Sequence, residues 1–147
     1  MRITIRPLQE ADLAEWDALF DAYVRFYEAE VTDDVVALTW QRLLSRQDGL
    51  FGLAAVAAGG RLIGIAHALF RRSTWSPTFY CYLEDLFVDP GARGQGVGRA
   101  LIEAVNREAD ANGCTRTYWA TKSENTVARR LYDGLATLSP FVQYRRE

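Results

Sequence analysis

The strongest constraint on this chain is a glycine-dense stretch, residues 89–99, that separates two segments of different periodicity. Residues 79–88 before it are rich in strand-forming side chains, whereas apolar residues recur every four positions over residues 97–109 after it. A turn from a strand into a helix leaves helix N–H groups unpaired and favours a bound anion. The stretch therefore predicts an α/β fold with an anion-binding turn; a turn that binds no ligand is the alternative.

Three phosphate-binding patterns can be compared with this turn. The pattern GxGxxG requires glycine where Arg99 stands, and GxxxxGK requires lysine where Val97 stands. The pattern RxxGxG is satisfied by Arg93, Gly96 and Gly98. Glycine at these positions lets the backbone approach an anion closely.

Helices and strands are predicted along the whole chain. Residues 3–5 form a short strand that stops at Pro7, and residues 13–27 carry a helical apolar stripe, with Asp12 and Glu15 as a capping box. The other predicted elements are a helix from Thr32 to about residue 44, strands 50–58 and 62–70 joined at Gly59-Gly60, strands 115–121 and 141–144, and a helix 126–132.

Composition limits the classes of function. At 147 residues the chain is expected to form a single domain, 1–147, and its net charge of −2 argues against nucleic-acid binding. No signal segment or membrane-spanning run is evident, so a cytoplasmic protein is expected. Cys81 and Cys114 have no CxxC spacing, and with His67 as the one histidine no metal site is predicted.

Three segments together resemble the GNAT superfamily of N-acetyltransferases: residues 83–90, residues 93–98 with the RxxGxG pattern, and residues 125–132. Residues 82–88 and 141–144 look most like the subgroup of yeast histone and polyamine acetyltransferases. The resemblance implies an α/β (α+β) fold with a mixed, mostly antiparallel twisted sheet. That sheet would open in a V-shaped split and be flanked by about four helices.

The resemblance also implies acetyl-CoA as the cofactor, with its pantetheine arm lying in the split like an added strand. Asn125 resembles the family asparagine that contacts this arm, although an Asn there is equally a helix N-cap. The residues expected to hold the cofactor are Leu86, Phe87, Val88, Arg93, Gly94, Gln95, Gly96, Val97, Gly98, Arg99, Asn125 and Ala128.

Acetyl transfer to an amine requires a proton acceptor and a proton donor. Glu84 is the predicted base, and Tyr132 matches the family tyrosine that protonates the leaving thiolate. Strand alternation places Glu84 and Asp85 on opposite faces unless a bulge intervenes. A structural role remains the alternative for both predicted catalytic residues, and a core position is favoured for His67.

In the fold that this sequence resembles, the acidic joint between the first two helices, residues 27–34, borders the acceptor opening. The expected substrate-binding residues are Tyr27, Glu28, Tyr82 and Glu84, and a solvated acidic loop with a capped helix start is the alternative for the joint. Acidity there favours a cationic amine, although Arg71 and Arg72 could instead bind a carboxylate or the adenosine phosphate. We therefore predict acetyl transfer through a ternary complex to a polyamine, an amino-acid-like amine or a peptide lysine. A non-catalytic acyl-CoA sensor is the alternative, and a homodimer is compatible with the resemblance.

Overall fold

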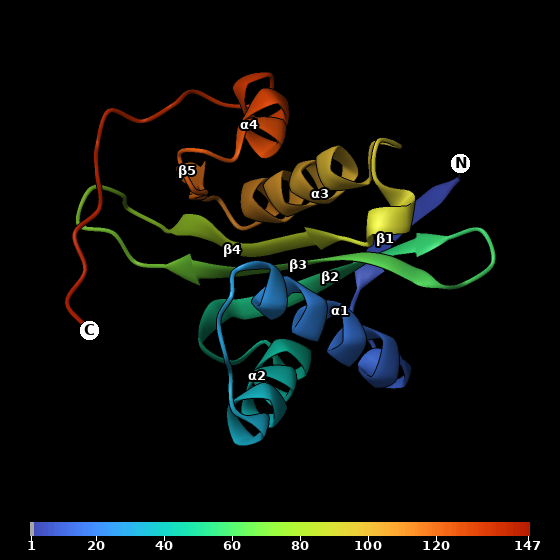
Figure 1. Ribbon diagram of the computed structural model, residues 1–147. Helices are drawn as coiled ribbons and strands as arrows, with labels where there is room; N and C mark the ends of the chain where they lie inside the picture. Colours follow the sequence, from blue (N-terminus) through green and yellow to red (C-terminus); the bar gives the residue numbers. More distant parts are fainter. Residues whose placement is uncertain (1) are drawn as a thin grey trace.

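The computed structural model describes residues 2–147, which form a five-stranded sheet with helices on both faces (Figure 1). The strands are β1 (Ile3–Pro7), β2 (Leu50–Ala57), β3 (Leu62–Arg71), β4 (Tyr80–Val88) and β5 (Arg116–Tyr118), and they follow this order across the sheet. The helices are α1 (Leu13–Phe26), α2 (Asp33–Ser45), α3 (Val97–Ala111) and α4 (Thr126–Asp133). Helices α1 and α2 lie on one face, and α3 and α4 lie on the other.

Strands β1 to β4 are paired antiparallel, and β5 runs parallel to β4. The pairing between β4 and β5 covers Tyr80 to Tyr82 alone. From Leu83 to Val88, the side of β4 that faces away from β3 therefore has no strand partner. This arrangement confirms the predicted mixed, mostly antiparallel, open sheet.

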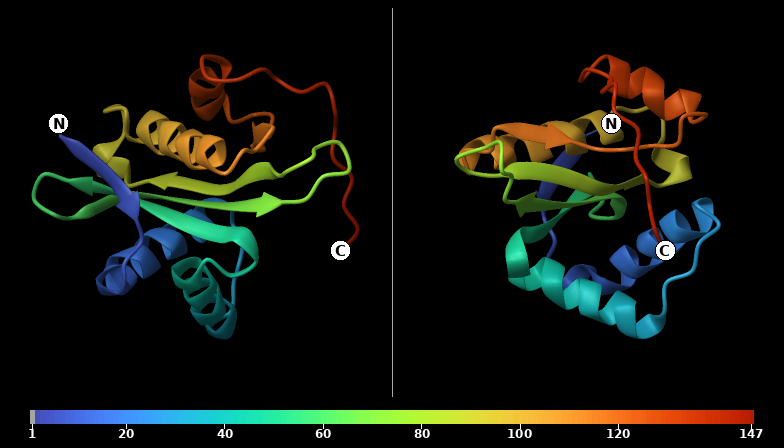
Figure 2. Two further views of the ribbon diagram at one scale, coloured as in Figure 1. Left: turned by 180° about the vertical axis from the view of Figure 1, so that it is seen from behind. Right: turned by 90° about the vertical axis from the view of Figure 1, so that its left-hand side faces the viewer.

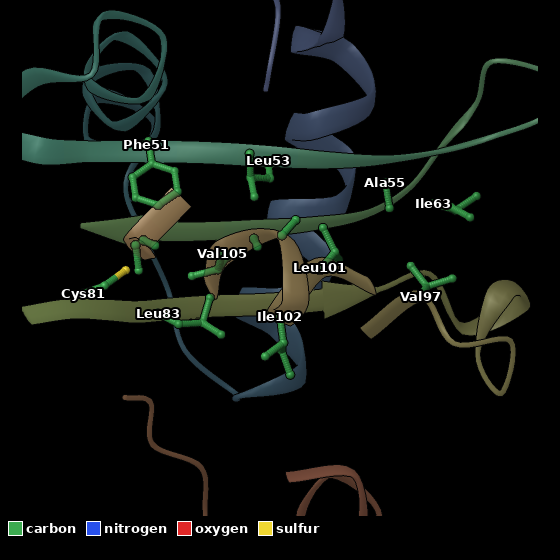
Figure 3. Close-up of a cluster of buried hydrophobic side chains, with 14 of the residues drawn as sticks. Phe51, Leu53, Ala55, Ile63, Cys81, Leu83, Val97, Leu101, Ile102 and Val105 are labelled. Atoms are coloured by element: carbon green, nitrogen blue, oxygen red, sulfur yellow. The ribbon is translucent and has the colours of Figure 1, made fainter. Parts of the chain in front are cut away.

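The core consists of one apolar layer on each face of the sheet. On the α3 side, Leu101, Ile102 and Val105 are fully buried against β2, β3 and β4 (Figure 3). On the other side, Trp16 is 0% exposed and its ring lies 5.2 Å from that of Phe20. The period-3.6 stripe predicted for α1 is thus confirmed as its buried face.

The predicted capping box of Asp12 and Glu15 is wrong. The Asp12 carboxylate instead accepts two hydrogen bonds from the Arg6 guanidinium, at 2.7 and 2.9 Å. The Glu15 carboxylate accepts a bond from the Leu62 backbone N–H at 2.9 Å. Asp12 also accepts from the Gln9 backbone N–H at 2.8 Å, within the 3-10 turn before α1. Neither carboxylate caps α1, because Arg6 of β1 and the Leu62 N–H of β3 are their partners instead.

The predicted last strand, residues 141–144, is also wrong. Residues 137–147 form no helix or strand, and Phe141 and Tyr144 are 87% and 92% exposed. The tail runs outward past the end of the sheet (Figure 2). Alternating aromatic residues supply β propensity, but a strand also needs a neighbouring edge to pair with, which this segment does not meet. The predicted strand 115–121 is correspondingly short, Arg116–Tyr118.

No helix within residues 2–147 is both long enough and apolar enough to cross a membrane.

We predict that the packing of α3 on β3 is sensitive to one added methyl group. A Cβ at Gly64 would lie 3.0 Å from Val97 Cγ1, 3.1 Å from Leu101 Cδ1 and 3.2 Å from the Phe87 carbonyl oxygen. Overpacking of this kind costs about 1–3 kcal/mol. Gly64→Ala should lower the urea midpoint of unfolding accordingly.

Gly59→Ala is the matched control, because a Cβ there meets nothing within 4 Å. It should leave the midpoint unchanged or raise it slightly. Equal midpoints for the two variants would contradict the tight contact between α3 and β3.

Candidate functional site

The glycine turn leaves a row of backbone donors open to a ligand. Gly94 and Gly96 adopt φ values of +78° and +83°, and a Cβ at either position would meet nothing within 4 Å. Gly96 is the N-cap of α3 and has no side chain to satisfy the first N–H groups. Among the described residues, the backbone N–H groups from Gly94 to Arg99 have no acceptor. An anion placed here would meet both these donors and the positive end of the α3 dipole.

Side chains at the end of β4 hold this turn in place. Asp89 accepts a hydrogen bond from Arg61 at 2.8 Å and one from the Gly91 N–H at 3.2 Å. Arg93 donates from Nε to the Val88 carbonyl at 3.1 Å, and its guanidinium lies over the Phe87 ring. The arginine of the RxxGxG pattern thus joins the turn to the last residues of β4.

Helix α4 packs closely on the first turn of α3. A Cβ at Gly98 would lie 3.3 Å from Leu131 Cδ2 and 3.9 Å from Val88 Cγ2, so glycine permits this approach. The Asn125 side chain caps α4 by accepting from the Ala128 N–H at 3.3 Å. The structure thus bears out the N-cap interpretation of Asn125.

A β-bulge brings Glu84 and Asp85 to the same side of the sheet. His67 pairs with Asp85 and Ala68 with Leu83, so Glu84 is the extra residue without a partner on β3. Strict alternation would have placed Asp85 on the α3 face, beside Leu83. The extra residue turns Asp85 to the α1 face instead.

Both carboxylates line a cavity of about 450 Å³ between the sheet and helices α1 and α2, which we call the helix-side cavity. Most of its wall is apolar or aromatic, and its ionisable or polar members come from α1, α2, β3 and β4. The lining residues are Phe20, Tyr23, Val24, Tyr27, Ala29, Val31, Val35, Thr39, Arg42, Leu43, Leu50, His67, Glu84 and Asp85.

His67 links α1 to Asp85 through two hydrogen bonds, of which the one to Trp16 is fully buried. The Trp16 indole Nε1–H donates to His67 Nε2 at 2.9 Å, and His67 Nδ1 lies 2.9 Å from Asp85 Oδ2. An indole nitrogen can only donate, so Nε2 is the acceptor and the proton of the neutral imidazole is on Nδ1. His67 therefore donates to Asp85. The prediction of a buried, satisfied core histidine is confirmed, with the ring 2% exposed.

The two carboxylates have different surroundings. The Asp85 carboxylate accepts from His67 at 2.9 Å. Burial, and then the nearby Asp85 carboxylate, raises the pKa of the Tyr23 hydroxyl well above its usual value. Glu84 is exposed at the cavity mouth and makes no side-chain hydrogen bond with a described residue. Loss of solvent on its cavity side, followed by the adjacent Asp85 charge, raises the pKa of Glu84.

Tyr132, on α4, does not line the helix-side cavity and packs against the core on the α3 side of the sheet. Its ring packs edge-on against Trp119 with centroids 5.5 Å apart. Burial, and then the neighbouring Tyr27 hydroxyl, raises the pKa of Tyr132. Lys122 Nζ lies 5.7 Å from the centre of the Tyr27 ring, so the loop before α4 also reaches α1.

The predicted acceptor residues are therefore only partly brought together. Tyr27 and Glu84 line the cavity, whereas Glu28 is exposed outside its wall and Tyr82 stacks on Tyr118 at 4.9 Å. Sequence reasoning missed Tyr23, Arg42 and Asp85 as cavity residues. The α1 stripe marks Tyr23 as inward-facing, but no local pattern indicates the bulge or the position of Arg42.

Arg71 and Arg72 lie elsewhere and have partners. Arg71 donates to the Tyr118 hydroxyl at 2.6 Å, and the Arg72 guanidinium stacks over Phe79. Neither side chain lines the helix-side cavity.

Solved structures share the whole architecture. AAC(6')-Iy in complex with the bisubstrate analogue CoA-S-monomethyl-acetylneamine superimposes with a TM-score of 0.85 and 26% identity, over 100% of this chain and 99% of that one. A second similarity is to AAC(6')-Ih from Acinetobacter baumannii, with a TM-score of 0.80 and 22% identity, and it shows the fold alone.

Relatives in sequence are acetyltransferases as well. The chain is 34% identical to the D-amino-acid N-acetyltransferase HPA3 of Saccharomyces cerevisiae, over 99% of this chain and 91% of that protein. It is 30% identical to thialysine N-epsilon-acetyltransferase of Bos taurus, over 84% of this chain and 71% of the relative. The family model described as Acetyltransferase (GNAT) family matches residues 16–135. The chain therefore belongs to the GNAT family and is an acetyltransferase.

Proposed function

We propose that this protein transfers an acetyl group from acetyl-CoA to a primary amine in a ternary complex. The acceptor would be a small polyamine, an amino-acid-like amine or a lysine side chain. The observation that carries the proposal is the unpaired half of β4, which has the glycine turn at its end and the helix-side cavity against its α1 face. A donor and an acceptor bound at these two places would meet beside Glu84.

The residues around the turn fit a coenzyme A molecule. The unpartnered N–H groups from Gly94 to Arg99 suit a pyrophosphate, and the free edge of β4 suits an extended amide-containing arm. The residues proposed to hold it are Leu86, Phe87, Val88, Arg93, Gly94, Gln95, Gly96, Val97, Gly98, Arg99, Asn125 and Ala128. When bound, acetyl-CoA supplies a thioester as the acetyl donor.

Glu84 is proposed as the base. An alkyl ammonium has a pKa of about 10.4, so it must lose a proton before it can attack a carbonyl at neutral pH. Glu84 lies at the cavity mouth without another partner, and its raised pKa brings it closer to neutrality, where a base works best.

Tyr132 is proposed as the acid. Because its pKa is raised, the hydroxyl keeps its proton at neutral pH and can supply it to the departing sulfur. The presence of both groups favours an enzyme over the alternative of a non-catalytic acyl-CoA sensor.

The relatives are compatible with small amine acceptors. Their names specify D-amino acids, thialysine and aminoglycosides, which all carry a primary amine. The acidic pair of Glu84 and Asp85 would attract such cations, which supports the same acceptor class.

The proposed acid predicts a defect in turnover rather than in folding. Tyr132→Phe should lower kcat by about 100-fold, because general acid catalysis contributes at least that much. Thiol release from acetyl-CoA, measured over a panel of amino acids, polyamines, aminoglycosides and lysine peptides, reports this change.

Tyr144→Phe is the control, since Tyr144 is an exposed tyrosine in the C-terminal tail. It should retain full activity. Thiol release that is equally fast in both variants would remove Tyr132 from the mechanism; no release with any amine, together with no acetyl-CoA binding, would refute the proposed function.

The proposed base predicts a specific pH profile. Glu84 must be deprotonated to act, so kcat/KM should fall as the pH drops through its raised pKa, at a pH above the ordinary glutamate range. Glu84→Gln should lose about 100-fold in kcat/KM and should also lose this acidic limb. Glu147→Gln, in the exposed tail, serves as the control. An unchanged acidic limb in Glu84→Gln would assign the base to another group.

A further inference from the structure

The helix-side cavity carries charges of both signs. Glu84 and Asp85 bring carboxylates from β4, and Arg42 brings a guanidinium from α2. The remaining wall is apolar or aromatic except for Thr39 and His67. A ligand that complements this cavity has an ammonium group, a carboxylate and an apolar body.

Asp85 is held in a fixed orientation for the cationic group. Trp16 is fully buried and sets the tautomer of His67, so the imidazole N–H points to Asp85. Tyr23 lines the cavity close to the same carboxylate. The His67 imidazole is a neutral donor, and no arginine or lysine of the described residues forms an ion pair with Asp85. The carboxylate is therefore oriented by His67 and remains free to bind a cation.

Arg42 is available for the anionic group. Within residues 2–147 its guanidinium forms no ion pair and no hydrogen bond, although Arg6, Arg25, Arg46 and Arg61 all pair with carboxylates. An arginine on a cavity wall without a carboxylate partner is well suited to bind one from a ligand, because the guanidinium fork matches that geometry.

We propose that this cavity binds an amino carboxylate, with its ammonium at Asp85 and its carboxylate at Arg42, and that Trp16 and His67 position Asp85 for this role. The inference rests on the proposed function and narrows its acceptor class. A diamine would place a second cation in the cavity that holds Arg42, which costs affinity. An amino carboxylate satisfies both charges.

The test compares acceptors that have a free carboxylate with acceptors that lack one. Thiol release from acetyl-CoA is measured with leucine as both enantiomers, leucinamide, isoamylamine, 6-aminohexanoate and putrescine. The free carboxylate should raise kcat/KM by roughly 10- to 100-fold over the amide and the amine, as expected for loss of a hydrogen bond to a charged group. Comparison of leucine with 6-aminohexanoate tells which spacing of the two charges fits.

Arg42→Glu reverses the charge that is proposed to bind the ligand carboxylate. The variant should lose the preference for amino carboxylates, and its kcat/KM for putrescine should rise relative to that for leucine. Gln41→Glu is the control, because it adds a negative charge at the neighbouring position of α2, outside the cavity lining. Its acceptor preference should match that of the unmodified protein.

The role of His67 is tested by the KM for each substrate. His67→Leu should raise the KM for the amino carboxylate about tenfold and leave that for acetyl-CoA unchanged, whereas His67→Gln, which keeps one donor and one acceptor, should restore much of the loss. Equal rises in both KM values would assign His67 a purely structural role and remove it from the proposal.

Failure of the amino-carboxylate site and failure of the acetyltransferase function would give different results. Turnover of isoamylamine, leucinamide and putrescine as fast as that of both leucine and 6-aminohexanoate would overturn the amino-carboxylate site while leaving the acetyltransferase function intact. An unchanged acceptor preference in Arg42→Glu would overturn it as well. Absence of thiol release with every acceptor would instead refute the proposed function itself.

Discussion

Two hydrogen bonds through one buried imidazole tie α1 to the centre of the sheet, and the helix-side cavity depends on them. Trp16 donates to His67, and His67 donates to Asp85, so one line of contacts crosses α1, β3 and β4. Buried polar groups are costly unless they are paired, and here each group has its partner. The same pairing that stabilises the core therefore also fixes a carboxylate at the cavity wall.

The second constraint is the local irregularity of β4. Pairing with β5 ends at Tyr82, and the bulge at Glu84 follows two residues later. The first leaves one edge of the strand free, and the second turns two adjacent carboxylates to the same side. A regular strand would have buried Asp85 in the apolar layer beneath α3. Strand β4 thus has fewer strand-pairing hydrogen bonds, and in return it presents a free edge and a cavity wall to a ligand.

Electrostatics distinguishes the two carboxylates although they are neighbours in sequence. Asp85 accepts a hydrogen bond from the neutral His67 imidazole. The Glu84 side chain has no hydrogen-bond donor among the described residues and lies beside the Asp85 carboxylate, which contributes to its raised pKa. Binding a cation and accepting a proton require different properties of a carboxylate. Here the surroundings of the two side chains, rather than their residue type, give them these different properties. The proposed division of roles follows from this difference.

The sequence alone determined the elements whose signals are local: the glycine turn before α3, the hairpin at Gly59-Gly60, the apolar stripe of α1 and the Asn125 cap. It failed where a contact depends on how the elements pack together. Asp12 binds Arg6 of β1 instead of capping α1, Glu15 binds the start of β3, and residues 141–144 find no strand edge. Only the tertiary structure decided that Asp85, His67 and Arg42 share one cavity, because a one-residue bulge and the packing of α2 on the sheet leave no periodic trace in the sequence.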